Sequence, residues 1–455
     1  MTIDPNLEIP VPSSPPDQPL AVLPLLENDA IDVHAQRRSI ALVGWGIFVT
    51  SLGQTAAVGL LPLRYLLKEK LGYTPNQMAG FLALVILPWN FKLILGLLSD
   101  NVRLFGTRRR HYLLLSTMAV AGMWLVLALV PRTTHWLLST AIVLNVAMVM
   151  ASVVVGGLLV ECGQKYRTTG RMASARMLST SIAGMVTGVL GGYLASKAFG
   201  WTAVTGAVLL LSLTVVTFFF LPEARSPAAM DSPLHIIGRQ LKASFSSGTL
   251  WVAGLLIFLV QICPGFQTPL FYYQTDTLHL TAQFIGTLGV ISYGVGVAGC
   301  LLYARYCKTI TLRKLLAIGI FISIAATCAY YRYATTAQVI AVEAFSGLAI
   351  VLVQMPLHDL ASRATPKGSE AMGYALMMSA WNLGMSASDV IGSHLYTHYH
   401  VGFRSLIWLN AGTTALVLLA IPLLPKRLVE TTELEGVILM EVTTEESASQ
   451  TKRPH

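Results

Sequence analysis

Apolar runs of membrane-spanning length recur along almost the whole of this chain. A helix that crosses a bilayer needs about 20 predominantly apolar residues, and about twelve such runs follow one another between Ser39 and Leu424. We predict spans at residues 39–62, 76–99, 111–130, 136–160, 173–195, 200–221, 249–272, 283–304, 312–331, 335–358, 371–396 and 402–424. The sequence therefore predicts an all-α, multi-pass integral membrane protein.

Charged residues are too few for a soluble protein of this length. Only 12% of the 455 residues are charged and 54% are hydrophobic, whereas soluble domains carry about 25% charged residues. The chain has no nucleotide-binding loop, no His/Cys metal spacing and no soluble domain large enough for a catalytic site. We expect no enzyme activity, cofactor or metal, and we expect the five cysteines to be reduced thiols.

The positive charges are concentrated in every second loop between the predicted spans. Clusters such as Arg37-Arg38 and Arg108 to Arg110 fall on one side, and the loops on the other side are poorer in Lys and Arg. This asymmetry follows the positive-inside rule and places both termini in the cytoplasm. It explains the net charge of +9 without nucleic acid as a partner. We expect the protein to lie in the lipid bilayer of a bacterial cytoplasmic (inner) membrane.

One outer loop departs from this charge pattern. The segment after the first span carries Arg64, Lys68 and Lys70. Its sequence predicts that the chain continues as a short amphipathic helix to Gly72 before the second span begins. We place these three cations on the outer side of the membrane.

The predicted spans divide into two groups of six around one long link. The expected parts are a disordered cytoplasmic tail (1–38), an N-terminal six-helix half (39–221), a cytoplasmic linker (222–248), a C-terminal six-helix half (249–424) and an unstructured cytoplasmic tail (425–455). The sequence GGYL at 191–194 is echoed by GSHL at 392–395, about 200 residues later. This faint repeat is typical of a transporter built from two related halves.

The stretch from Pro88 to Tyr112 resembles a gate between two spans. Gly96 would allow a neighbouring helix to approach closely, and Asp100 would lie at a helix end, where it can pair with Arg108 or Arg109. The alternative is a loop that only sets the orientation of the chain.

The seventh predicted span is interrupted by Pro264, Gly265 and Pro269, which must break its hydrogen bonding. Irregular backbone at membrane depth is tolerated where it lines a cavity. Gln267 and Tyr272 near this break are therefore candidates for a cavity wall. A proline kink that only shapes packing is the alternative.

Five segments resemble the folate–biopterin transporter family of the major facilitator superfamily. They are PWNFK (88–92), GLLSD (96–100), FGTRRRHY (105–112), LFYYQTDTLHL (270–280) and MPLHDLASRATPKGSEAMGYALMMSAWNLG (355–384). The resemblance implies a twelve-helix fold of two six-helix halves, alternating access, and uptake of folates or pterins that is typically coupled to protons.

The chain departs from this family in the fourth span. The family commonly has a pattern like DVVVDALVVE, whereas this chain has SVVVGGLLVE at 152–161, with Ser152 and Gly156 in place of the two aspartates and Glu161 retained. A carrier for a different solute, such as an exporter or an ion carrier, is therefore an alternative function. A non-transporting sensor or scaffold on the same fold is a further one.

Charged residues inside spans identify the candidate site, because each costs about 2.5–3.5 kcal/mol on insertion scales and usually faces the bundle interior. Lys92, Glu343 and Asp389 are such residues. For a folate-like ligand, the substrate-binding candidates are Lys92 and Arg176 for carboxylates, and Trp89, Gln267, Tyr272, Trp381 and Asn382 for the flat ring.

Asp389 and Glu343 are the candidates for proton coupling, since they are the only deep carboxylates. Each charged candidate has an alternative. Lys92 could extend toward the cytoplasmic surface, Glu343 could be solvated near the outer surface, and Asp389 could form a structural ion pair with Lys92. We expect a monomer whose partner is a small folate-like or pterin-like solute.

Overall fold

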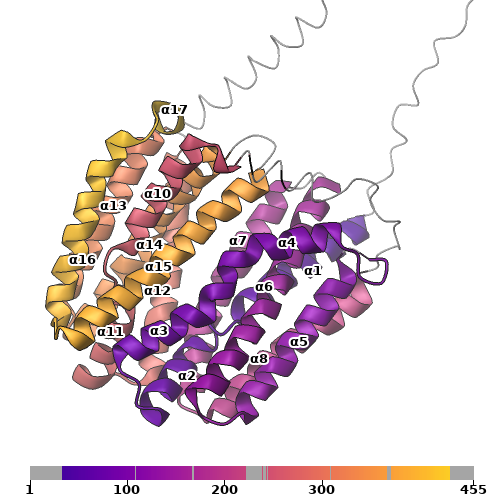
Figure 1. The fold of residues 1–455 in the computed structure, drawn as a ribbon, viewed down its shortest axis with the longest axis horizontal. Coiled ribbons are helices and arrows are strands. Elements are labelled where there is room, and N and C mark those ends of the chain that lie inside the picture. Colours follow the sequence, from indigo (N-terminus) through magenta and orange to yellow (C-terminus); the bar gives the residue numbers. More distant parts are fainter. Residues whose placement is uncertain are drawn as a thin grey trace, which may run out of the picture.

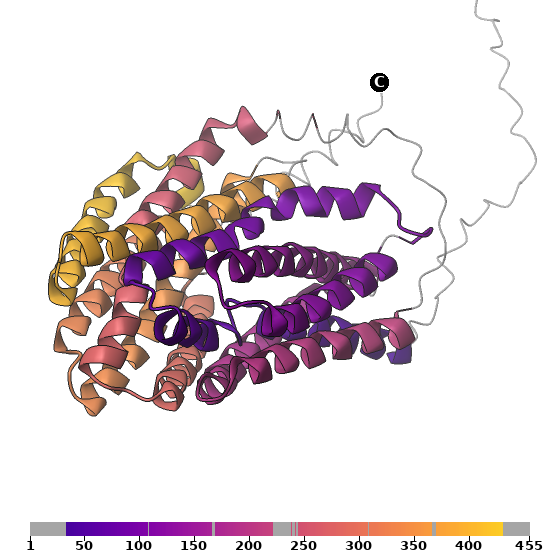
Figure 2. The ribbon, with the colours of Figure 1, turned by 60° about the horizontal axis from the view of Figure 1, so that its bottom comes forward.

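The chain folds into two bundles of helices that lie side by side (Figure 1). The computed structural model describes residues 33–107, 109–165, 169–221, 244–307, 309–365 and 370–430, together with Gly238 and Lys242. The first bundle is formed by residues before the predicted linker and the second by residues after it. A view from a second direction separates the same two groups of helices (Figure 2).

The N-terminal bundle contains six helical segments of membrane-spanning length, some of them interrupted. Its elements are α1 (Val33–Leu52), α2 (Leu60–Tyr65), the π-helical turn η1 (Leu66–Lys70), α3 (Pro75–Ile86), the 3-10 turn η2 (Leu87–Phe91), α4 (Lys92–Asn101), α5 (Arg110–Leu129), α6 (Thr134–Lys165), α7 (Thr169–Ala195) and α8 (Phe199–Phe220). The predicted short helix is present as α2 and η1, but it continues the first span, which was predicted as one run (39–62) and is interrupted between α1 and α2.

The C-terminal bundle has the same organisation. Its elements are α10 (Gly248–Ile262), α11 (Gln267–Tyr272), the π-helical turn η3 (Tyr273–Thr277), α12 (Ala282–Tyr306), α13 (Leu312–Ala329), the 3-10 turn η4 (Tyr330–Arg332), α14 (Thr336–Ala364), α15 (Glu370–His398), α16 (Phe403–Val417), the 3-10 turn η5 (Leu418–Leu423) and α17 (Lys426–Val429).

Ten helical segments of the described ranges are long and apolar enough to cross a membrane. The helices α1 and α15 are also of membrane-spanning length, with 20 and 29 residues. They are more polar, because α1 includes Arg37 and Arg38 and α15 includes Asn382 and Asp389. Together these segments confirm the predicted all-α membrane fold of two six-helix halves.

The internal repeat predicted from sequence appears in the spacing of the helices. The helix α15 begins 201 residues after α7, and α11, η3 and α12 each begin 207 residues after α2, η1 and α3. Each half therefore has a first span that breaks near its middle and ends in a π-helical turn. In the sequence alone, the signal of this repeat is only a four-residue echo.

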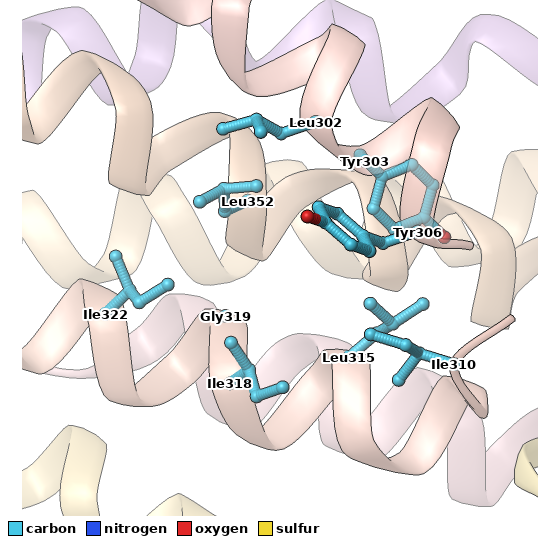
Figure 3. A pocket seen from close by; sticks show the side chains of 9 residues that line it. All are labelled: Leu302, Tyr303, Tyr306, Ile310, Leu315, Ile318, Gly319, Ile322 and Leu352. Atoms are coloured by element: carbon cyan, nitrogen blue, oxygen red, sulfur yellow. The ribbon is translucent and has the colours of Figure 1, made fainter.

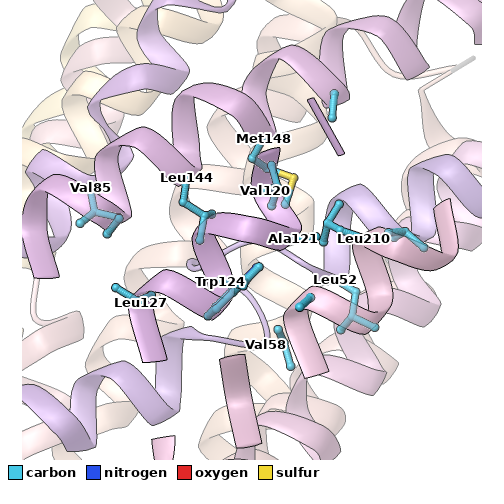
Figure 4. Close-up of a cluster of buried hydrophobic side chains, with 14 of the residues drawn as sticks. Leu52, Val58, Val85, Val120, Ala121, Trp124, Leu127, Leu144, Met148 and Leu210 are labelled. Carbon is cyan, nitrogen blue, oxygen red and sulfur yellow. The ribbon is translucent and has the colours of Figure 1, made fainter. Parts of the chain in front are cut away.

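A buried tryptophan fixes the break in the first span. The side chain of Trp124, from α5, is fully buried, and its Nε1 donates a hydrogen bond of 2.9 Å to the carbonyl oxygen of Gly53. Gly59 and Gly206 leave the space that its ring occupies, because a Cβ at either would come within 2.6 Å of the ring. Figure 4 shows this ring among the apolar side chains of the N-terminal core.

The predicted tails and linker need two corrections at their edges. The helix α1 begins at Val33, inside the predicted N-terminal tail, because the helix extends past the apolar run. The predicted C-terminal tail begins with α17, whose Leu428 and Val429 are buried in the core of the C-terminal bundle. The start of that tail was predicted to be unstructured, which is wrong. Most of both tails and of the linker lie outside the described residues.

Candidate functional site

The break in the seventh span is filled by protein side chains from two neighbouring helices. The carbonyl oxygen of Cys263 accepts a hydrogen bond from the Ser388 hydroxyl, and that of Pro264 accepts one of 2.9 Å from Asn410. The amide of Gly265 donates to the carbonyl oxygen of Ser388 at 2.9 Å. The backbone groups that the break releases are thus bound by α15 and α16, which favours a packing role for the break.

Asp389 fixes the start of the helix that follows this break. Its two carboxylate oxygens accept hydrogen bonds from the Thr268 backbone amide at 2.8 Å and from the Thr268 hydroxyl at 2.6 Å. Within the described ranges, Asp389 makes no ion pair with Lys92. Gln267, beside Thr268, is exposed.

Lys92 lies where the second span changes from a tight turn to a regular helix. Pro88 opens the 3-10 turn η2, and α4 begins at Lys92. The Lys92 Nζ donates to the Ser152 hydroxyl at 3.3 Å and lies 5.5 Å from the centroid of the Trp89 ring. The Trp89 indole in turn donates to the Oδ1 of buried Asn145 at 3.2 Å. The lysine forms no ion pair with any described residue.

A second group of aromatic and basic residues comes from the C-terminal bundle. The His358 ring stacks on Trp381 with centroids 5.1 Å apart, and its Nδ1 lies 3.0 Å from the Tyr374 hydroxyl. The charge of Arg176, on α7, acts on both Lys92 and His358. The positive charge of Arg176 therefore lies near both Lys92 of the N-terminal bundle and His358 of the C-terminal bundle.

We call Trp89, Lys92, Arg176, His358 and Trp381 the cationic aromatic cluster. The bundles touch beside it, where the Ser379 hydroxyl donates to the carbonyl oxygen of Asn90 at 2.9 Å. Asn382, the residue after Trp381, is half-buried and makes no hydrogen bond to a described side chain. Positive charges next to flat rings are suited to an anionic aromatic ligand.

Glu343 lies inside the C-terminal bundle in a short chain of hydrogen bonds. It accepts a hydrogen bond of 2.8 Å from the Tyr333 hydroxyl, which itself accepts one of 2.7 Å from Gln274. Glu343 is half-buried, and Tyr333 and Gln274 are buried. The carboxylate is therefore linked to the π-helical turn η3.

The gate residues that the structure describes form a network within the N-terminal bundle. Arg109 is 5% exposed, pairs with Glu161 at 3.0 Å, and donates to the Ser99 hydroxyl at 3.2 Å. Its guanidinium packs on Gly157, where a Cβ would come within 2.5 Å. A Cβ at Gly96 would make an ordinary contact of 3.6 Å, so that position has room for alanine. The Asp100 side chain and the whole of Arg108 lie outside the described part of the chain.

Side chains at one end of the molecule hold the two bundles together, and we call this end the joined end. Lys68, on η1, contacts Thr275 and Asp276 on η3. The hydroxyl of Tyr272, which is buried here, donates to the carbonyl oxygen of Tyr73. The amide of Asn76 donates to the Thr397 hydroxyl at 3.3 Å.

Sequence reasoning missed Arg64 and Lys68 as functional candidates. Both were placed on the outer side without a role, and each contacts the C-terminal bundle: the Arg64 Cζ lies 5.6 Å from the centroid of the Phe271 ring, and Lys68 pairs with Asp276. The available signal was the departure of this loop from the charge asymmetry. Cations in a loop on the side that is poor in Lys and Arg indicate that the loop contacts another part of the protein.

An apolar cavity lies away from these residues. Its volume is about 270 Å³, and it opens between α12, α13 and α14, all of the C-terminal bundle (Figure 3). Leu315, Ile318 and Leu352 are among its lining side chains. Because this lining is almost entirely apolar and belongs to one bundle, we do not assign the charged ligand site to it.

The fold is shared with solved membrane transporters of two helical bundles. The chain is similar to the nucleoside transporter NupG, with a TM-score of 0.66 and 14% identity over 86% of this chain and 98% of that one. It is also similar to a D-xylose–proton symporter, with a TM-score of 0.63 and 14% identity over 87% and 98%. At these identities the likeness shows the fold.

The sequence then gives the family. The model of the BT1 family matches residues 53–442, and the chain belongs to that family. A folate-biopterin transporter of Synechocystis sp. is 28% identical over 80% of this chain and 77% of the relative. A probable folate-biopterin transporter 4 of Arabidopsis thaliana is 25% identical over 77% and 85%, and folate transporter 2 of Plasmodium falciparum is 25% identical over 80% and 84%. The protein is thus a membrane transporter of a small solute and not an enzyme, and the resemblance seen in the sequence is confirmed.

Proposed function

We propose that this protein is a secondary transporter of organic anions of the folate and pterin type, which works as a monomer by alternating access between its two bundles. The observation that carries the proposal is the cationic aromatic cluster, which combines residues of both bundles. The names of the relatives supply the solute class.

The chemistry of a folate fits this cluster. Its carboxylates require cations, which Lys92 and Arg176 supply. Lys92 forms no ion pair with a described acidic residue. Its flat pterin ring can stack on Trp89 or Trp381. Because the charges at the cluster are positive, we favour an anion over a metal cation as the transported solute.

The orientation follows from the loop charges. With both termini in the cytoplasm, the joined end faces outward, and the described conformation is closed to the outside. We propose the bacterial cytoplasmic membrane as the location, and transport would require the contacts at the joined end to break and re-form.

Glu343 is our first candidate for proton coupling and Asp389 our second. Through Tyr333 and Gln274, Glu343 is linked to the turn that holds Asp276 at the joined end. Gain or loss of a proton at Glu343 would therefore change the hydrogen bonds of a segment that must move. Asp389 is bound on both oxygens by Thr268, which suits a structural role.

The test is uptake of labelled folate and of uncharged biopterin into cells that express the protein, with and without a protonophore. We expect uptake to fall when the proton gradient collapses, and we expect Glu343→Gln to remove that dependence. Lys92→Ala should reduce folate uptake by about tenfold and biopterin uptake much less, since an interaction between charged groups is worth about 1.5–3 kcal/mol. Lys314→Ala, at an exposed lysine, is the control.

Absence of uptake of both compounds by a protein present in the membrane would contradict the proposal. Equal losses for folate and biopterin in Lys92→Ala would assign Lys92 to structure. Unchanged proton dependence in Glu343→Gln would move the coupling site to Asp389, where Asp389→Asn tests it in the same assay.

A further inference from the structure

Arg64, in the last turn of α2, is a cation at the boundary between the two bundles. Its Cζ lies 5.6 Å from the centroid of the Phe271 ring of the other bundle. Its Nε is buried without a hydrogen-bond partner, and none of the described residues forms an ion pair with the guanidinium. Because an arginine is always charged and carries five donors, such a position is costly unless an acceptor arrives.

The polar groups nearest to Arg64 are already engaged with other partners. Asp389 acts on it electrostatically, but both carboxylate oxygens of Asp389 accept hydrogen bonds from Thr268. Tyr272 also acts on it, but the Tyr272 hydroxyl donates to the carbonyl oxygen of Tyr73. Among the residues that the structure describes, none therefore accepts a hydrogen bond from Arg64.

A second arginine shows how a structural residue of this kind is satisfied. The Cζ of Arg132 lies 5.5 Å from the centroid of the Phe199 ring, nearly the same ring contact as that of Arg64. Its guanidinium, however, donates to the carbonyl oxygens of Leu127 at 3.0 Å and Ala128 at 2.8 Å. The difference between the two arginines is that Arg132 has two acceptors, whereas Arg64 has none within the described ranges.

Arg64 is also displaced from the cationic aromatic cluster toward the joined end. Its neighbour Asp389 follows Trp381 by eight residues on α15, which corresponds to about 12 Å of helix rise. The contact of Lys68 with Asp276 lies one helical turn beyond Arg64. An anion bound at Arg64 would therefore lie directly beneath the contacts that close the joined end.

We propose that Arg64 forms a second anion-binding subsite, which binds a carboxylate of an elongated organic anion whose other end contacts the cationic aromatic cluster. The proposal rests on the proposed function only for the contact between the other end of the anion and the cationic aromatic cluster. A guanidinium binds a carboxylate through two parallel hydrogen bonds, which fixes its orientation as an ammonium group would not.

The test measures thermal unfolding of the purified full-length protein with folate, p-aminobenzoylglutamate and uncharged biopterin, in wild type, Arg64→Gln and Arg132→Gln. We expect the two anions to raise the unfolding midpoint of wild type and of Arg132→Gln. In Arg64→Gln, anion binding should weaken by at least about tenfold, as expected for loss of a charged hydrogen bond, while any biopterin effect persists.

The ligand-free proteins give an independent readout. Arg64→Gln should not lower the midpoint, because it removes a charge that has no hydrogen-bond acceptor or ion pair among the described residues, whereas Arg132→Gln should lower it, because it removes two hydrogen bonds. Arg64→Lys should recover part of the anion binding, since it restores charge without the bidentate geometry.

The proposal is overturned if the anions stabilise Arg64→Gln as well as wild type, or if neither anion stabilises wild type. It is also overturned if Arg64→Gln lowers the ligand-free midpoint and loses biopterin and anions alike. Anion binding that depends on Arg64, in a protein that takes up no folate, would instead contradict the proposed function and leave the subsite standing.

Discussion

At the scale of single residues, the functional character of the site depends on which charges lack an internal partner. Lys92 lies 3.3 Å from the Ser152 hydroxyl, at the position where the family pattern has an aspartate. A Cβ added at Gly156, the second such position, would meet no neighbouring atom within 4 Å, so that position has room for a side chain. A serine leaves Lys92 without an ion pair within the described ranges, and in the proposed function this charge binds the anionic solute.

A carboxylate at position 152 should remove this availability. In Ser152→Asp the new side chain would reach Lys92 and pair with it, so we expect folate uptake to fall by about tenfold and biopterin uptake to change little. The measurement is initial uptake rates in cells. Ser152→Asn, which has nearly the same size without the charge, is the control, and unchanged folate uptake in Ser152→Asp would show that Lys92 does not bind the anion.

Residue-level prediction relied on charges that interrupt an apolar run. Lys92 and Glu343 stand out in the sequence because they break such runs, and both are half-buried with polar partners in the folded protein. Arg64 did not stand out, because it lies near the end of a span among other cations. Only the packing of Phe271 from a segment 207 residues later gives it a defined position.

At the scale of helices, close approach between the bundles depends on glycines of α7 and α12. A Cβ at Gly188 would come within 2.6 Å of the Gly286 carbonyl oxygen, and one at Gly192 within 2.9 Å of the Ala282 carbonyl oxygen. Glycines four residues apart, as at 188 and 192, allow this close approach. The glycines alone do not identify α12 as the partner.

Gly188→Ala should separate these two helices. The added methyl group would contact backbone atoms, which cannot move without the helix, so we expect a loss of about 1–3 kcal/mol of stability. Gly122→Ala, in α5, is the matched control, because a Cβ there meets nothing within 4 Å and alanine favours the helix by up to about 1 kcal/mol. Thermal unfolding of both variants in detergent checks this, and equal midpoints would refute the packing role.

The broken seventh span shows the same division between local and distant information. Pro264, Gly265 and Pro269 predict the break by themselves, because they remove or distort backbone hydrogen bonds. The groups that satisfy the break, Ser388 and Asn410, come from two helices more than a hundred residues away. Whether a break lines a cavity or packs against protein therefore depends on the tertiary structure.

At the scale of the whole molecule, the contacts at the joined end connect the two bundles. Lys68 reaches from one bundle to Asp276 of the other, and its Nζ lies 4.8 Å from the centroid of the Tyr272 ring. The positions of Lys68 and Thr275 are equivalent in the two halves, being 207 residues apart. Their contact therefore joins the equivalent π-helical turns of the two halves.

Loss of this contact should shift the protein toward a conformation that is open at the joined end. Exposed ion pairs contribute up to about 1 kcal/mol, so Lys68→Ala should change the ratio of the two conformations by up to about fivefold. The measurement is the distance distribution between spin labels at Lys70 and Thr277, both exposed, in a background without the five cysteines. We expect a larger fraction of long distances.

Two variants complete this experiment. Lys197→Ala removes a lysine that lies 5.3 Å from the centroid of the Tyr193 ring within one bundle, and it should leave the distribution unchanged. Lys68→Asp combined with Asp276→Lys should restore it. A distribution that is the same in Lys68→Ala and wild type would mean that other contacts, such as Tyr272 with Tyr73, hold this end closed.

The sequence by itself determined the membrane fold, the number of spans, the division into halves and the family, because these follow from apolar run lengths, local breaks and short motifs. The tertiary structure decided which charges meet and which remain unpaired. Lys92 faces Ser152, Asp389 binds Thr268, and Arg64 packs on Phe271 with no acceptor in the described part of the chain. Such pairings depend on contacts between distant segments, and a change of one residue at a single contact changes the charge that a solute meets.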